Sequence, residues 1–517
     1  MNRFRLTAAS VLLAALAPLA PLHRPLASQT PTVDTSGAGA LIDQGLTHSQ
    51  VMPNLQYLTD VIGPRLTGSP AARAANDWTM ARFKEYGLDA RLEQWNFGGT
   101  WTRGPMWMRM TAPRLHDVAA ASWAWAPGTS GKTVNGPVVR IDASTPESLD
   151  ANKGKVKGAW VMLRAPSFVW NNDGPPMAAA DSERQRAAFR GLFGGGQRLD
   201  SAARARLTQF NTDQPFVLRN SGALGILLDG GKEQDLLNMS GSPTRVLPLP
   251  QVVVAHEDYA LLDRLLGAGV TPRLEANIQN TLSMKDSVPQ WNTVAEIRGS
   301  AHPGQVVIVG AHLDSWDLGT GATDNGTGSM ATLEAARIIA QSGLKPKRTI
   351  RFILFTGEEQ GLMGSRKYAE AHAPDADSIQ AVIVLDNGAG AITGMALQGH
   401  LESYALWRML LAPVHRLNAD TINDAVKGGT DHLSFIPYGV PGFNFNQITR
   451  GYNHTHHSQS DTYDKAIAAD LMQASSVMAV SAFELANLPD MLPRWEKRLP
   501  VQPIVAATVS PELLRGH

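Results

Sequence analysis

The chain reads QVVIVGAH at residues 305–312, RTIRFILFTG at 348–357 and AVIVLD at 381–386. Each of these apolar runs has the length and composition of a buried β-strand, and the stretches between them have helical spacing. Strands that alternate with helices in this way are typical of a mainly parallel sheet. We therefore predict an α/β fold with a mainly parallel mixed sheet and helices on both of its faces.

Ionisable side chains stand at the end of each predicted strand. His312 ends the first strand with Asp314 two residues later, Glu358 and Glu359 follow the second strand and open a helix, and Asp386 ends the third. The carboxyl ends of parallel strands meet along one edge of a sheet, where α/β proteins place their ligand sites. These side chains should therefore converge.

Two further segments add ligands of the same types. Asp324 lies in the glycine-rich stretch GTGATDNGTG (319–328), and histidines gather in NHTHHSQSDTYD (453–464). Histidine nitrogens and carboxylate oxygens suit zinc, and two metal ions that share a carboxylate need a set of this kind. The adjacent Glu358 and Glu359 can diverge, so that one binds metal while the other faces the attacking water. The sequence therefore indicates a two-metal hydrolase.

The composition excludes several other classes of protein. The 517 residues include 46 basic and 46 acidic side chains, so the formal net charge is zero. Without a basic excess, neither nucleic acid nor an anionic membrane surface is expected as a partner. The chain has no cysteine, which excludes disulfides and thiolate metal ligands. A hydrophobic content of 43% is that of a soluble globular protein.

Residues 1–28 have the pattern of a secretory signal peptide. Arg3 and Arg5 precede an apolar stretch from Ala8 to Leu22, and small residues follow near Ala27. Beyond residue 30 no apolar run approaches the roughly 20 residues of a membrane span. We therefore expect a secreted or periplasmic protein without a membrane span after signal cleavage.

The pattern changes along the chain in a way that predicts two domains. Residues 122–283 have short strands, many glycines and no cluster of ligand residues, which indicates a smaller β-rich domain inserted into a catalytic domain formed by 40–118 and 285–495. A hairpin around Gly98 and Gly99 is expected from the alternating runs Leu88–Phe97 and Trp101–Met110. The expected helices are Leu41–Val61, Pro70–Tyr86, Ser182–Leu192, Ser201–Phe210, Ser329–Gln341, Met363–Ala371, Ser403–Leu417 and Ala466–Asn487.

Five motifs resemble, in order and spacing, those of the di-zinc exopeptidases of metallopeptidase family 28. They are HLDSWD (312–317), GATDNGTG (321–328), TGEEQG (356–361), VLDNGAG (384–390) and HHSQSDTYD (456–464). Within the family the chain is most similar to the carboxypeptidase Q branch, through HLDSWD and GGTDHLSF (428–435). The segments GKVKGAWVML (154–163) and SGALGILLD (221–229) resemble a protease-associated domain, more weakly. The resemblance implies the zinc exopeptidase fold and two zinc ions per chain.

The resemblance also implies the metal ligands. His312 and Asp386 would bind one zinc ion, Glu359 and His457 would bind the other, and Asp324 would bridge them. His457 is chosen because the family's His-x-x-x-Asp-Thr spacing fits it, and His456 is the alternative.

Other residues would act beside the metals. Glu358 would be the general base, and Asp314 would accept the second ring N–H of His312, which fixes its tautomer. Asp431 and His432 either line the substrate cleft or form a turn.

The resemblance implies hydrolysis of a terminal peptide bond of short peptides, of the carboxypeptidase or dipeptidase type. An aminopeptidase of the same family is the alternative, followed by a glutaminyl cyclase-like acyltransferase with a single zinc ion and by a non-enzymatic receptor-like protein. A carboxypeptidase needs cationic or N–H groups for the substrate carboxylate, and Arg450, Lys427 and Asn453 are candidates. The sequence leaves side-chain preference and the oligomeric state open, with a homodimer among the options.

Overall fold

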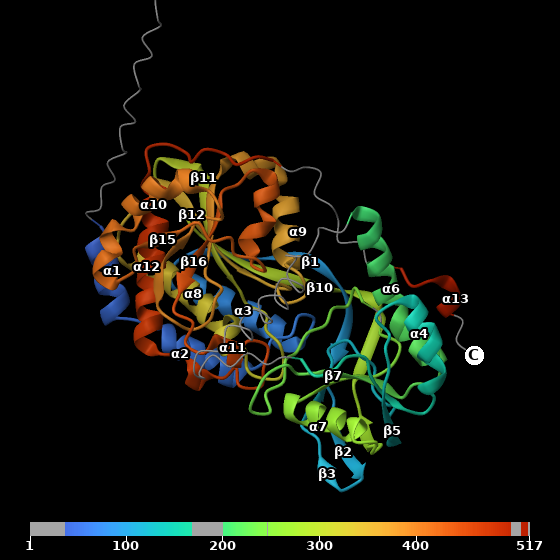
Figure 1. Cartoon of the computed structure of the whole chain (residues 1–517). Coiled ribbons are helices and arrows are strands. Elements are labelled where there is room, and N and C mark those ends of the chain that lie inside the picture. Colours follow the sequence, from blue (N-terminus) through green and yellow to red (C-terminus); the bar gives the residue numbers. More distant parts are fainter. Residues whose placement is uncertain (1–36, 168–199, 246, 498–507, 515–517) are drawn as a thin grey trace, which may run out of the picture. The chain divides into compact units, whose positions relative to one another are not determined.

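The computed structural model describes residues 37–167, 200–245, 247–497 and 508–514, which contain two eight-stranded sheets within one compact unit of the chain (Figure 1). The expected signal peptide and the expected helix at residues 182–192 lie outside the described residues. In the part of the chain that is described, no helix combines the length and the apolar character that crossing a membrane requires.

The first sheet is mixed, with parallel strands at its centre. Strands β12, β11, β13 and β16 run parallel to one another, whereas β1, β10 and β14 each pair antiparallel with a neighbour. The prediction of a mainly parallel mixed sheet is therefore confirmed. In spatial order the strands are β1 (Asp89–Thr102), β10 (Thr281–Ile297), β12 (Arg348–Phe355), β11 (His302–His312), β13 (Ile379–Val384), β16 (Gly442–Gln447), β14 (Ile392–Ala396) and β15 (Thr421–Asn423).

Helices cover both faces of this sheet, because alternate residues of each central strand enter different cores. In β11, Val307 and Val309 belong to a core with α1 (Ala38–Thr47), α3 (Pro70–Glu85), α8 (Thr327–Gln341) and α12 (Ala468–Asn487). Val306 and Ile308 instead pack in the core that contains Tyr368 of α9 (Met363–Ala371). The buried strands β11, β12 and β13 read as continuous apolar runs for this reason.

The predicted hairpin at residues 88–110 is wrong. Strand β1 continues through Gly98 and Gly99 to Thr102 and pairs along its length with β10, with a shift of register between Gly98 and Thr100. Gly99 has a φ of +50°, so the two glycines form a bulge inside one strand rather than a turn between two. The alternating pattern correctly indicates a strand at residues 88–97, but the strand that pairs with it, β10, lies nearly two hundred residues later in the sequence.

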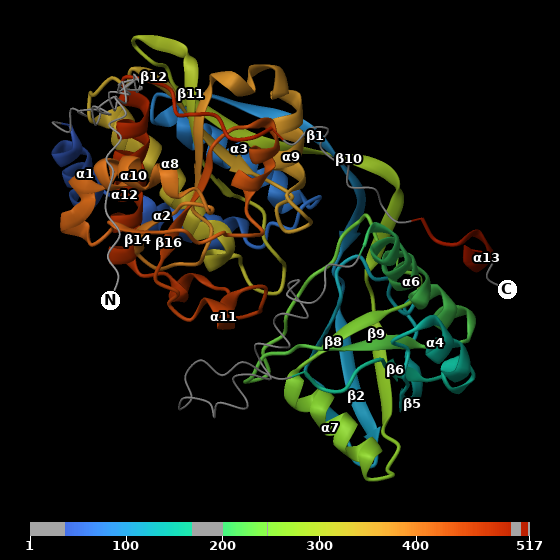
Figure 2. The same ribbon diagram turned by 45° about the horizontal axis from the view of Figure 1, so that its top comes forward.

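The second sheet lies between helices as well. Figure 2 shows α7 (His256–Gly267) on one side of it and α4 (Pro146–Asn152) and α6 (Ser201–Asn220) on the other. Its first long strand, β2, pairs with β9 and so belongs to this sheet, although it falls within the range 40–118 expected for the catalytic domain. In spatial order the strands are β3 (His116–Asp117), β2 (Met106–Ala112), β9 (Arg273–Ile278), β5 (Val134–Arg140), β6 (Trp160–Met162), β7 (Gly225–Asp229), β8 (Gln251–Val254) and β4 (Ala120–Ser122).

The connection between the two sheets consists of two chain segments that lie side by side. The last residue of β1, Thr102, is paired with the first residue of β10, Thr281. The chain therefore leaves the first sheet and returns to it at facing positions.

Two predicted helices are interrupted. The expected helix at residues 41–61 consists of α1, α2 (Val51–Gln56) and a π-helical turn over Tyr57–Ile62. The expected helix at residues 403–417 is α10 (Tyr404–Leu410) followed by a 3-10 helix over Ala412–Leu417. Pro413 lacks a backbone N–H and cannot continue the α-helical hydrogen bonding, which explains the second break.

Candidate metal centre

The centre lies where the parallel strands β12, β11 and β13 end. His312 is the last residue of β11, and Asp386 follows the end of β13 by two residues. Glu358 and Glu359 lie in the turn between β12 and α9, rather than at the start of a helix as predicted. Gly357 and Gly361 have positive φ values of 74° and 108°, so this turn needs glycine on either side of the glutamate pair.

The carboxylate of Asp324 lies between two sets of ligand atoms. On one side, His312 Nε2 is 3.3 Å from Asp324 Oδ1 and 3.4 Å from Asp386 Oδ1. On the other, His457 Nε2 is 3.4 Å from Asp324 Oδ2 and 3.0 Å from Glu359 Oε2. Two ligands of one tetrahedral zinc ion stand roughly 3.3–3.6 Å apart, as follows from its usual bond lengths. The residues present therefore fit two metal positions that share Asp324.

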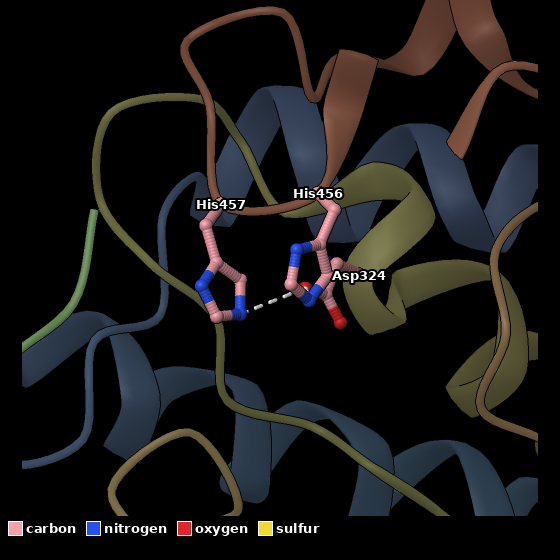
Figure 3. A group of neighbouring side chains, drawn as sticks. All are labelled: Asp324, His456 and His457. Carbon is pink, nitrogen blue, oxygen red and sulfur yellow. Dashed lines mark ion pairs between the residues drawn. The ribbon is translucent and has the colours of Figure 1, made fainter. Parts of the chain in front are cut away.

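Both candidate histidines lie beside Asp324 (Figure 3). The ring of His456 stacks on that of His457, with centroids 3.7 Å apart, and His456 Nε2 is 3.8 Å from Asp324 Oδ2. The side chain of His456 is 43% exposed, whereas that of His457 is 20% exposed and also reaches Glu359. The geometry therefore favours His457 as a ligand and places His456 beside it at the pocket wall.

Buried carboxylates at this density need a cation. Burial raises the pKa of Glu358 well above its usual range, and burial together with the charge of Asp324 does the same for Glu359. Asp324 Oδ2 and Glu359 Oε1 are buried, and neither accepts a hydrogen bond from any of the described residues. Bound metal ions would neutralise these charges and occupy the unpaired oxygens.

Asp314 is positioned differently from the prediction. The Nδ1 atom of His312 lies 3.0 Å from the backbone oxygen of Asp314 and 3.6 Å from its carboxylate. The carboxylate instead accepts the backbone N–H groups of Glu358 and Glu359, at 3.3 and 3.4 Å, and the hydroxyl of Thr67 at 2.9 Å. Asp314 therefore links the histidine strand to the glutamate turn.

Two positioning residues were missed in the sequence. Arg65 is fully buried and donates hydrogen bonds to the backbone oxygens of Gly63, Leu313, Thr320 and Gly321, at 2.7–3.0 Å. It thus holds together the two ends of the loop between His312 and Asp324. In the sequence, Arg65 stands in the polar, glycine-containing segment GPRLTGS (63–69), and no local pattern there indicates that its side chain is buried.

Asp461 is the second residue of this kind. Its carboxylate accepts the backbone N–H of Thr323 at 2.6 Å and that of Asp324 at 3.1 Å. Burial and the neighbouring charge of Asp324 raise the pKa of Asp461 to about 7. In the sequence, Asp461 and Thr462 stand out only through their spacing from His457, whereas in the structure Asp461 orients the turn that carries Asp324.

The centre opens into a pocket of about 380 Å³. Its lining includes Glu358, Glu359, Asp324, Asp386 and both candidate histidines, together with Asn387, Tyr452, Gly428, Gly429 and Thr430. Asp431 and His432, expected at a substrate cleft, do not line this pocket and are fully buried behind it. The ring of His432 bonds the hydroxyl of Thr430 at 2.6 Å, so it supports the wall rather than forming it.

Comparisons with known proteins agree with this geometry. Residues 292–482 match the model of a family described as Peptidase family M28. Carboxypeptidase Q of Rattus norvegicus is 30% identical over 442 residues, which cover 85% of this chain and 86% of that protein. An aminopeptidase of Pseudomonas aeruginosa is 26% identical over 410 residues, 76% of this chain and 69% of that protein.

Solved structures share the fold. A peptidase M28 precursor from Shewanella amazonensis aligns with a TM-score of 0.71 and 24% identity, over 90% of this chain and 99% of that one. A zinc aminopeptidase from Bacillus subtilis aligns with a TM-score of 0.58 and 17% identity, over 84% of this chain and 93% of that one.

Proposed function

Because the chain belongs to peptidase family M28, we propose that it is a secreted or periplasmic di-zinc exopeptidase that hydrolyses a terminal peptide bond of short peptides. The observation that carries the proposal is the position of Asp324, which turns one carboxylate oxygen to each of two ligand sets. His312 and Asp386 would hold one zinc ion and Glu359 and His457 the other. The donor set of imidazole and carboxylate, without cysteine, suits zinc with an open position.

When bound, the two ions supply Lewis-acid chemistry, which polarises the scissile carbonyl and makes a water more acidic. Glu358 lies on the pocket wall with Oε2 3.9 Å from His312 Nε2, so its carboxylate borders one of the two ligand sets. It takes the proton of the attacking water and returns it to the leaving amine. Asp314 and Asp461 fix the backbone of the glutamate turn and of Asp324, so the reacting groups are held in place before substrate binds.

The carboxypeptidase or dipeptidase type is favoured over the aminopeptidase type. Carboxypeptidase Q of Rattus norvegicus matches at 30% identity, against 26% for the Pseudomonas aminopeptidase, and over more of both chains. The aminopeptidase remains the second candidate because its likeness also extends over most of this chain.

A set of dipeptides and tripeptides, each blocked at one end, tests the proposal by mass spectrometry with zinc-loaded protein. We expect cleavage of peptides with a free C-terminus, tolerance of N-terminal acetylation, and two zinc ions per chain by elemental analysis. Rapid hydrolysis of amino-acid nitroanilides would instead identify an aminopeptidase. One zinc ion in fully active protein would contradict the two-metal arrangement.

A further inference from the structure

A lysine that follows a strand of the second sheet contacts the loop that lines one side of the metal pocket. Lys232 follows β7 after a turn in which the carboxylate of Asp229 accepts the N–H of Gly231 at 3.0 Å. The ammonium group of Lys232 donates a hydrogen bond to the backbone oxygen of Asn453, in the loop that carries His456 and His457. The same loop lines the pocket through Tyr452 and both histidines.

The position of Lys232 is fixed by further contacts between its segment, residues 232–239, and that loop. Met239 donates its N–H to the backbone oxygen of His457 at 2.8 Å. Gln459 both donates to the backbone oxygen of Asp235, at 2.8 Å, and accepts the N–H of Leu237, at 2.9 Å. The segment that carries Lys232 is therefore held against the histidine loop.

The ammonium group of Lys232 has hydrogen-bond donors that could bind a ligand. An ammonium group has three, and the bond to Asn453 uses one. Among the described residues Lys232 makes no ion pair, although the charges of Asp324 and Asp461 oppose the lowering of its pKa by burial. Burial lowers the pKa of Lys232 to about 8, so the side chain is still mostly charged at pH 7.

The other cations near the pocket are less suitable. Arg450 is paired with Asp470, at 2.7 and 3.2 Å, and Arg65 is enclosed by backbone oxygens. Lys427 precedes the pocket-lining Gly428 and is the remaining rival. Asn453 offers its backbone oxygen to Lys232, so this candidate from the sequence acts by placing the ammonium group.

We propose that Lys232 binds the C-terminal carboxylate of a short peptide whose scissile bond lies at the metal centre. The proposal rests on the exopeptidase function proposed above and names the group that makes a free C-terminus necessary. A cation fixed at one distance from the centre selects peptides with few residues after the scissile bond. The second sheet thereby contributes to substrate choice, while the first sheet carries the metal ligands.

The test compares one dipeptide as the free acid and as the C-terminal amide, on wild-type protein and on three variants. Lys232→Met removes the charge and keeps the length, Lys232→Arg keeps the charge, and Lys427→Met tests the rival lysine. Loss of a charge-assisted hydrogen bond should lower kcat/KM for the free acid by about 10- to 100-fold, mainly through KM. The amide should be cleaved as slowly as before, Lys232→Arg should recover part of the loss, and Lys427→Met should match wild type.

Other outcomes separate the alternatives. An equal loss for acid and amide in Lys232→Met would show that the lysine only docks the loop, and this overturns the proposal. A selective loss in Lys427→Met instead would assign the carboxylate to Lys427. Wild-type protein that cleaves acid and amide equally would refute a carboxylate anchor, whereas zinc-loaded wild type that cleaves no short peptide would refute the proposed function itself. Zinc content and thermal midpoint, measured for every variant, exclude loss of the centre or of folding as the cause.

Discussion

Replacing Arg65 by lysine should destabilise the protein and weaken metal binding, although the positive charge is kept. The guanidinium group donates to four backbone oxygens from three nitrogens, and three of these acceptors lie on the two ends of the loop between His312 and Asp324. A lysine ammonium is a single point and cannot span these acceptors, so we expect at least two of them to lose their donor. Each unsatisfied buried group costs about 1–3 kcal/mol, which predicts a decrease of about 2–6 kcal/mol in the free energy of unfolding.

Urea unfolding of the chelator-treated protein measures this loss without a contribution from bound metal, and competition with a zinc indicator measures affinity separately. Because the loop connects the two proposed metal ligands His312 and Asp324, zinc affinity should fall about 10- to 100-fold, as for other residues that orient ligands. Arg408→Lys is the matched control, since Arg408 is exposed on α10 and should change the free energy of unfolding by less than about 0.5 kcal/mol. If Arg65→Lys behaved like this control in both measurements, Arg65 would not be the residue that holds the loop.

Two further predictions concern the glutamate pair and His432. Glu358→Gln should keep the wild-type zinc content and lower kcat by about 10²–10⁴-fold or more, whereas Glu359→Gln should lower the zinc content. Elemental analysis and kinetics on both variants check this. If the two variants showed the opposite effects, the roles of Glu358 and Glu359 would have to be exchanged. Burial lowers the pKa of His432 from 6.5 to about 3. Below about pH 6.5 the His432 ring is therefore protonated in the unfolded chain but stays neutral in the folded protein. The free energy of unfolding should decrease as the pH falls from 6.5 toward 3, by about 1.4 kcal/mol per pH unit. Urea unfolding of chelator-treated wild type and His432→Asn at pH 7, 6 and 5 measures the difference, and parallel pH profiles would contradict it.

The central strands were predictable because each is buried on both faces and therefore appears as an unbroken apolar run. Strands β11, β12 and β13 are of this kind, and their parallel order explains why the residues at their ends converge. By contrast, β14 and β15 are short, and β15 is mostly exposed, so neither has a periodic pattern. The partner of β1 could not be inferred, since pairing depends on a strand far away in the sequence.

The same distinction applies to the site. Residues that follow strands, such as His312 and Asp386, were identified from motif and position, and the structure brings them together. Arg65 and Lys232 come from segments without such a pattern and reach the centre only through tertiary structure. Asp431 lies in a motif but is buried behind the pocket wall, because sequence does not show which side of a loop faces a cavity.

Because Thr102 and Thr281 face each other, residues 103–280 begin and end at neighbouring positions of the first sheet. If a two-residue turn joined β1 directly to β10, the two strands would form a simple hairpin, and the strand order of the first sheet would not change. The shortened protein would keep His312, Asp324 and the glutamate turn but would lose Lys232 and the segment that contacts the histidine loop. The same deletion would also uncover Trp316, which packs in one buried core with Trp125 and Met239, so the two parts are joined at a single point of the chain but are stabilised by a shared core.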